Sequence, residues 1–335
     1  IFVHLAFDEL RRLGLRDVTE ADIRREFPGQ TGMLVVDEII PQGVADGILQ
    51  VGDIIVEVNG EFVTSFVPLA AIFDDRVGDT IKLAVERYGE VVDVEVAVQD
   101  LHAITPREFI SFGDAVVHDL SYQQARHVNQ PIQGIYVANP GYVLANASVP
   151  RGAVITSVGE TPIATLDQFE IALAELADRE RATLRFYNFE DPVTSKLAVM
   201  TMDRRWFPAE RCARNDDTGL WPCVPLQNGG AAEAQQPATA TFIKRTDRRA
   251  RTVAPSLVLV NYDMPYTISG ISDRHYYGTG VIVDVDRGLV VVDRNTVPEA
   301  MGDVRITFAG EIEVQASVRY IHPTHNLALL EYDPA

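Results

Sequence analysis

Residues 32–61 decide the fold, and they read GMLVVDEIIPQG, a short spacer, and then LQVGDIIVEVNGE. The two runs of aliphatic and β-branched residues predict two strands, and Asn59-Gly60 favours the positive φ angles of a tight hairpin turn. The second run alternates between two faces, and we expect one face to be wholly apolar: Ile54, Val56 and Val58. This pattern is typical of a half-buried strand in a small β-sandwich or barrel.

Two landmarks flank the second strand: Gly52-Asp53 precedes it and Asn59-Gly60 ends it. Together they resemble the PDZ domain, in the form carried by the HtrA/Deg serine proteases. The resemblance implies peptide binding, in which an extended segment adds to the edge of a sheet.

The composition sets the broad class. The chain has 335 residues, 47% hydrophobic and 23% charged, which suits two or three globular domains. A net charge of -19 argues against nucleic-acid binding and suits basic or neutral polypeptides better. The PDZ resemblance implies unfolded or extended polypeptides and peptide termini as partners. No run is long enough for a membrane span, and we expect no cofactor and no metal. Because the sequence begins with Ile1 rather than Met, we expect an internal fragment.

The first PDZ-like domain is predicted at residues 1–100. An apolar strand at 1–5 precedes a helical turn that ends at Gly14, and a charged helical loop follows at 17–30. Residues 66–73 have apolar residues at helical spacing and predict the groove helix, and residues 81–98 predict a closing hairpin.

The pattern then repeats at a spacing of about one hundred residues, which predicts a second PDZ-like domain at residues 101–204. Val117-His118 echoes Val3-His4, and residues 134–137 echo 32–35. Residues 166–176 predict a second groove helix. The repeat differs in having Ala153 at the place of the aspartate and Gly159-Glu160 at the place of Asn-Gly, which predicts an altered second site.

Residues 205–252 are predicted to be an irregular segment and a linker. Cys212 and Cys223 fit either one local disulfide or two free thiols. Trp206 and Trp221 suggest packing over a neighbouring domain. The basic run at 244–251 fits an import or polyanion-binding patch, and equally the solvated end of a linker, which we favour.

Residues 253–335 read as short strands at regular spacing, which indicates a barrel. Strands are expected at 256–260, 276–284, 288–293, 304–309, 313–320 and 326–330. Their order, with Gly278-Thr279-Gly280 opening one strand, resembles the first barrel of a trypsin-like protease of the HtrA/Deg type. The fold predicted for the whole chain is therefore mainly β with short helices: two PDZ-like domains and the first half of a trypsin-like double β-barrel.

The resemblance places Asn295 where the family has its catalytic histidine, and Asn326 where it has the aspartate that orients it. An amide side chain is no general base near neutral pH, so the proton relay is missing. His322 and His325 lie near Asn326, and a displaced catalytic role for them competes with that of ordinary loop histidines. No Gly-x-Ser-x-Gly occurs, and we expect no catalytic residue in this chain.

The resemblance predicts a peptide site in each PDZ-like domain, between an edge strand and the groove helix. In the first domain its residues are Phe2, Val3, His4, Leu5, Phe66, Leu69 and Phe73. In the second they are Val116, Val117, His118, Leu120, Leu166, Phe169 and Leu173, with an edge strand at 116–120. The competing interpretation is that these apolar residues form the core.

Two details bear on these sites. The loop for a peptide carboxylate in the second domain would be residues 111–114, but Asp114 has the wrong charge, which leaves internal peptides or docking within the chain. His4 and His118 recur at matching places; this suggests a pH switch, although inheritance by duplication explains it more simply.

Three functions compete. The first is a regulatory, substrate-binding section of an HtrA/Deg-type protease in protein quality control, with other domains of the parent protein as partners and possible homo-oligomers. The second is a free-standing PDZ scaffold, and the third is an active protease with unusual catalytic residues. The resemblance leaves the compartment open; we favour the bacterial envelope over a nucleus or organelle.

Overall fold

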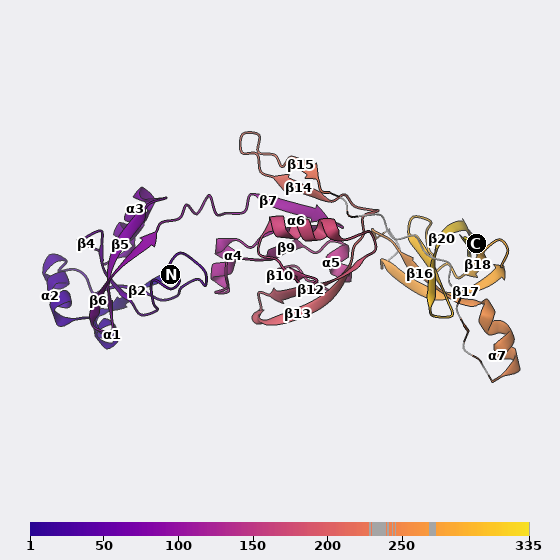
Figure 1. Cartoon of the computed structure of the whole chain (residues 1–335), viewed down its shortest axis with the longest axis horizontal. Helices are drawn as coiled ribbons and strands as arrows, with labels where there is room; N and C mark the ends of the chain where they lie inside the picture. The colour runs from indigo at the N-terminus through magenta and orange to yellow at the C-terminus, as the bar shows by residue number, and fades with distance from the viewer. Residues whose placement is uncertain are drawn as a thin grey trace. The chain divides into compact units, whose positions relative to one another are not determined.

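The computed structural model describes residues 1–227, 229, 239, 241, 242, 244, 246–267 and 273–334. The chain divides into two compact units, Ile1–Ala232 and Glu233–Ala335 (Figure 1). Within the described part, no helix is both long and apolar enough to cross a bilayer.

The first domain is built on an antiparallel sheet in the order β1-β2-β3-β5-β6, with β4 paired to β3. Its strands are β1 (Phe2–Ala6), β2 (Gly32–Val36), β3 (Ile54–Val58), β4 (Glu61–Phe62), β5 (Thr80–Arg87) and β6 (Glu90–Ala97). Its helices are α1 (Phe7–Leu13), α2 (Asp17–Glu26) and α3 (Phe66–Asp75). The predicted strands, groove helix and closing hairpin are all present.

The tight turn after β3 is confirmed, because Asn59 has φ 53° and Gly60 has φ 85°. The expected apolar face of β3 is wrong in one residue. A bulge between Ile55 and Glu57 shifts the register of β3 against β5. Val58 therefore joins Ile55 in the core under α3, whereas Ile54 and Val56 pack on the opposite face.

Two buried carboxylates tie the first domain together. Asp53 is 1% exposed and accepts two hydrogen bonds of 2.7 Å from Arg87. Glu86 is fully buried and accepts from the backbone N–H and the Nε of Arg16, at 2.8 and 2.9 Å, and from the hydroxyl of Thr19. Glu86 thus anchors the start of α2 on β5, since a buried carboxylate needs such partners.

The second domain has a larger antiparallel sheet in the order β13-β12-β10-β9-β8-β7-β14-β15, with β11 on β10. Its strands are β7 (Glu108–Phe112), β8 (Ala115–Asp119), β9 (Ile135–Asn139), β10 (Ala153–Val158), β11 (Thr161–Pro162), β12 (Arg181–Asn188), β13 (Asp191–Thr201), β14 (Glu210–Ala213) and β15 (Cys223–Pro225). Its helices are α4 (Tyr122–His127), α5 (Val143–Asn146) and α6 (Leu166–Glu175). Because β14 and β15 extend this sheet, the prediction that the chain is irregular from residue 205 is wrong for these strands.

The structural repeat differs from the expected register by one residue. Phe2 packs on the core under α3 and Leu5 on the opposite face. In the second domain Val117 packs on the core under α6 and Leu120 on the opposite face. Phe2 therefore corresponds to Val117, because a slip of one residue moves every side chain to the other face.

The expected match of Val3-His4 with Val117-His118 is therefore wrong, and His4 corresponds instead to Asp119. The same slip affects the next strand, where Leu34 corresponds to Ile135, since each packs on the core under its groove helix. The interpretation of His4 and His118 as a matched pair loses its basis.

The six strands expected in the last third close into a barrel in the order β16-β17-β18-β21-β20-β19. They are β16 (Leu257–Asp263), β17 (His275–Asp284), β18 (Leu289–Val292), β19 (Asp303–Phe308), β20 (Ile312–Ile321) and β21 (Ala328–Tyr332). A Cβ on Gly280 would lie 2.6 Å from Val290 and 2.8 Å from Val260, so the barrel core requires glycine there. The basic run contributes to α7 (Arg248–Val253), whose arginines are exposed, as a solvated face requires; a single 3-10 turn (Ala254–Ser256) follows it.

Candidate peptide-binding grooves

Strand β1 of the first domain pairs with β2 only, among the residues that the structure describes. The N–H of Phe7 donates to the carbonyl of Thr31 at 3.1 Å, and the carbonyl of Ile1 accepts from the N–H of Asp37 at 2.9 Å. Since alternate residues of an antiparallel strand bond to the same neighbour, the odd-numbered residues face β2. The backbone groups of Phe2 and His4 therefore point to the outer edge, where an extended peptide would pair.

Helix α3 presents an apolar stripe next to this core. Phe66 is 49% exposed, whereas Leu69 is 3% exposed and belongs to the core. Phe73 is partly buried and packs on the same core cluster as Phe2. Of the predicted helix residues, Phe66 and Phe73 thus have surface to offer a ligand, while Val3 and Leu5 pack on the opposite face of the sheet.

The predicted edge strand of the second domain is not an edge. Strand β8 pairs with β9 on one side and with β7 on the other, in the register Ile110 to Val117 and Phe112 to Ala115. The prediction of a free edge at residues 116–120 is therefore wrong, because the chain's own preceding strand occupies the place of a peptide.

The side chains of β7 fill the groove under α6. Ile110 and Phe112 are 0% and 1% exposed, and the ring of Phe112 meets that of Phe169 edge-on at 5.6 Å. Leu166 is 1% exposed, against 49% for Phe66 at the same position of α3. Most of the predicted peptide-binding residues of the second domain are thus core residues, as the competing interpretation expects: Val117, Leu120, Leu166, Phe169 and Leu173. The other two, Val116 and His118, are partly buried.

The predicted carboxylate loop of this domain is a two-residue turn. Gly113 and Asp114 have φ angles of 51° and 64° and join β7 to β8. The carbonyl of Gly113 accepts hydrogen bonds of 3.0 Å from the N–H groups of Tyr142 and Val143. A Cβ on Gly113 would lie 2.1 Å from Val143, so the turn requires glycine at this position.

Arg211 on β14 reaches over β7 to α6. Its guanidinium contacts Glu108 of β7 and donates to Asp167 at 2.7 Å and to Glu170 at 2.8 Å. Burial disfavours the charge of Arg211, but the hydrogen bonds to Glu170, Asp167 and Glu108 outweigh it and raise its pKa. Arg211 thus joins three elements of the filled groove.

Two other contacts close this arrangement. Asp119 at the end of β8 accepts a hydrogen bond of 2.6 Å from the N–H of Leu166, and burial raises the pKa of Asp119. Cys212 and Cys223 form a disulfide between β14 and β15, which decides between the two alternatives left open by the sequence. Glu210 lies close to both sulfurs, but a disulfide lacks the thiolates that a metal ion would need.

Both tryptophans pack on the second domain, as their sequence context suggests. The ring of Trp206 lies 5.3 Å from that of Tyr142, and the ring of Trp221 lies 5.2 Å from that of Phe109 on β7. The fluorescence of both tryptophans therefore reports on the packing of residues 205–225 against the second domain.

In the barrel, the two degenerate triad positions lie side by side. The side-chain oxygen of Asn326 accepts a hydrogen bond of 2.9 Å from the N–H of Arg294, next to Asn295. The Nδ1 of His322 accepts a hydrogen bond of 2.9 Å from the N–H of His325. The structure brings the two expected positions close together.

The sequence comparisons agree with this architecture. Residues 3–86 match the PDZ domain family, and residues 103–179 match the PDZ-like domain family. The fold and these matches define a tandem-PDZ section followed by one trypsin-like barrel. They agree with the resemblance to the HtrA/Deg family.

The relatives are more specific. The chain is 40% identical to the pro-apoptotic serine protease NMA111 of Coccidioides immitis, over 98% of this chain and 32% of the relative. It is 38% identical to the protein of that name from Aspergillus oryzae and 39% identical to that from Neosartorya fischeri, with the same coverage. The chain spans about a third of the length of these relatives.

The sequence analysis missed that β7 fills the second groove. A signal was present: the alternating apolar residues Ile110 and Phe112 run directly into Gly113-Asp114, a turn dipeptide, and then into the strand at Ala115. This is the pattern of a hairpin, not of an open loop.

We expect Arg211→Ala to destabilise the packing of β14 on β7 and α6. Removing a partly exposed network of ion pairs costs about 1 kcal/mol, so the urea transition should move to lower concentration. Tryptophan fluorescence measures the transition, since Trp206 and Trp221 flank β14 in the sequence and pack on Tyr142 and on Phe109 of β7.

Arg214→Ala is the control, because Arg214 bonds within its own hairpin, to Asp216 and Gly219. Equal transitions for the two variants would show that Arg211 does not hold the groove closed.

Proposed function

We propose that this chain is the polypeptide-binding and regulatory section of an HtrA/Deg-type serine endopeptidase that acts in proteolysis and protein quality control. The carrying observation is the first-domain groove, where β1 has one edge that no described residue pairs with, beside an exposed apolar stripe. Backbone pairing gives affinity to such a site, and the pockets for alternate side chains give selectivity.

The second domain supports the geometry of binding in the first. There, Ile110 pairs opposite Val117, the counterpart of Phe2, and β7 runs antiparallel to β8. A ligand of the first domain is accordingly an extended segment antiparallel to β1, with large apolar residues at alternate positions. Unfolded polypeptides expose such segments, whereas folded proteins bury them.

The chain itself is proposed to be non-catalytic, because Asn295 and Asn326 replace the base and its partner. The free-standing scaffold is the less supported alternative, since the relatives named above are serine proteases that extend well beyond this section.

The groove is tested with a fluorescein-labelled peptide of sequence Arg-Glu-Phe-Ile-Ser-Phe, which copies residues 107–112. Fluorescence anisotropy should show binding in the micromolar range. Phe66→Glu should weaken it at least tenfold, because a charge replaces apolar contact area.

Val67→Glu is the matched control: Val67 is 80% exposed on the same helix, one position along. The proposal fails if the peptide does not bind, or if the two variants bind it equally.

The lack of hydrolysis is tested with casein. We expect the substrate to stay intact on incubation with the chain, as judged by gel electrophoresis. Turnover that Asn295→Ala or His325→Ala abolishes would contradict the non-catalytic assignment.

A further inference from the structure

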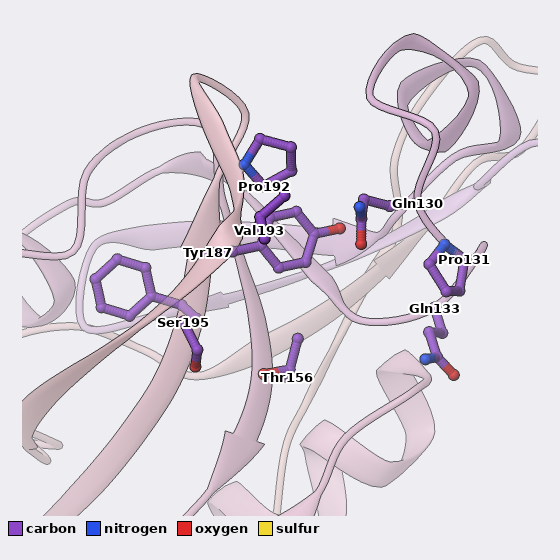
Figure 2. A pocket seen from close by; sticks show the side chains of 9 residues that line it. Gln130, Pro131, Gln133, Thr156, Tyr187, Pro192, Val193 and Ser195 are labelled. Atoms are coloured by element: carbon purple, nitrogen blue, oxygen red, sulfur yellow. The ribbon is translucent and has the colours of Figure 1, made fainter. Parts of the chain in front are cut away.

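A cavity of about 220 Å³ lies in the second domain, apart from the groove of β7 and α6. Its walls come from the loop after α4, from β10 and from the hairpin of β12 and β13: Gln130, Pro131, Gln133, Thr156, Phe186, Tyr187, Pro192, Val193 and Ser195. Figure 2 shows the Tyr187 hydroxyl on the side of Gln130, with Thr156 and Ser195 around the same space. The lining mixes polar and apolar side chains and contains no charged residue.

Two buried polar atoms of β12, of which only the Tyr187 hydroxyl belongs to a residue that lines the cavity, have no hydrogen-bond partner within the described chain. The hydroxyl of Tyr187 and the Oδ1 of Asn188 are both buried and unpaired. Tyr187 as a whole is 9% exposed. Leaving a buried polar group unpaired costs about 1–3 kcal/mol, so such groups indicate a missing partner.

The first domain shows what occupies this place in the repeat. Ile54 pairs with Glu86 and Val154 pairs with Tyr187, so Tyr187 is the counterpart of Glu86. Asn188 is likewise the counterpart of Arg87, and Ala153 that of Asp53. Both domains carry the same bulge in the third strand, which fixes the correspondence of Val56 with Thr156.

In the first domain, the sheet face that carries Val56 and Glu86 is covered by α2 and the residues before it. Arg16 and Thr19 bond to Glu86, and Ile23 packs in the same cluster as Val56. The second domain has no counterpart of α2: the whole connection from Leu120 to Gly134 is described, and it holds only α4. The cavity is therefore the place that a chain segment fills in one repeat and leaves empty in the other.

We propose that this cavity is a docking site for a short uncharged polypeptide segment of a partner, which offers a main-chain hydrogen bond to the Tyr187 hydroxyl. A polypeptide is favoured because a backbone N–H, that of Arg16, meets the matching position of the first domain at 2.8 Å. An uncharged one is favoured because Tyr187 replaces Glu86. Burial also raises the pKa of Tyr187 to about 12, so the phenol stays neutral at physiological pH.

The rim of the cavity suits the same ligand. Val193 is 88% exposed, and β13 pairs only with β12 within the described residues. Apolar contact area and a free strand edge thus lie beside the buried hydroxyl. The site is independent of the first-domain groove, and its failure would leave that proposal untouched.

The test uses N-acetyl-alanine N′-methylamide, an uncharged probe with two peptide groups, titrated into the isotope-labelled chain. We expect saturable shifts of the amide signals of Gln130, Gln133 and Ser195. Tyr187→Phe should weaken the binding about tenfold, the effect of one lost hydrogen bond. The corresponding arginine compound should bind at least threefold more weakly, because the lining offers no counter-charge.

Tyr136→Phe is the control, because Tyr136 lies on the same face, between His118 and Phe189, but does not line the cavity. The affinity of this variant for the probe should equal that of the unmodified chain. Without the probe, Tyr187→Phe should unfold at the same temperature or higher, since no partner is lost.

The proposal is overturned if no saturable shift occurs, if Tyr187→Phe binds like the unmodified chain, or if crystals soaked in the probe show only an ordered water on the Tyr187 hydroxyl.

Discussion

The pairing of β7 with β8 is the constraint on which the organisation of the second domain depends. Once Phe112 and Gly113 turn directly into Ala115, the groove under α6 is filled from within the chain. The burial of Leu166, the reach of Arg211 to α6 and the addition of β14 to the sheet all follow from that strand. The first domain lacks such a partner strand among its described residues, and Phe66 stays exposed there. Among the described residues, β1 of the first domain thus has one unpaired edge, whereas the groove of the second domain is filled by β7.

The sequence predicted the architecture well, for physical reasons that lie in particular residues. Asn59-Gly60 adopts the positive φ angles of a tight turn, and position 280 must be glycine because Val260 and Val290 leave no space for a Cβ. The turn and the barrel could therefore be predicted from single residues and their neighbours in the sequence. The register was less accessible. The bulge in β3 moves the side chain of Val58 to the opposite face of the sheet. A slip of one residue makes Asp119, and not His118, the counterpart of His4, because side chains alternate with a period of two.

The site was predicted only in part, because an edge is a property of the whole sheet. The residues of β8 have the same alternation whether or not β7 lies beside them, and only pairing between distant segments, such as Cys212 with Phe109, distinguishes the two cases. The loss of α2 is a second example. The sequence shows it as a shorter connection between β8 and β9 than between β1 and β2. Its consequence is an unpaired hydroxyl at Tyr187, which could be recognised only once the strand pairing had shown that Tyr187 corresponds to Glu86.

The central claim is that β7 fills the second groove, whereas β1 has no partner on its outer edge among the described residues. Residue-resolved amide hydrogen exchange of this 335-residue chain tests it most directly. Within the described residues, the N–H of His4 faces an unpaired edge, whereas that of Val117 faces β7. The account predicts exchange of His4 near the rate of an unprotected amide and protection of Val117 by about a hundredfold or more. Equal exchange of the two amides would contradict it.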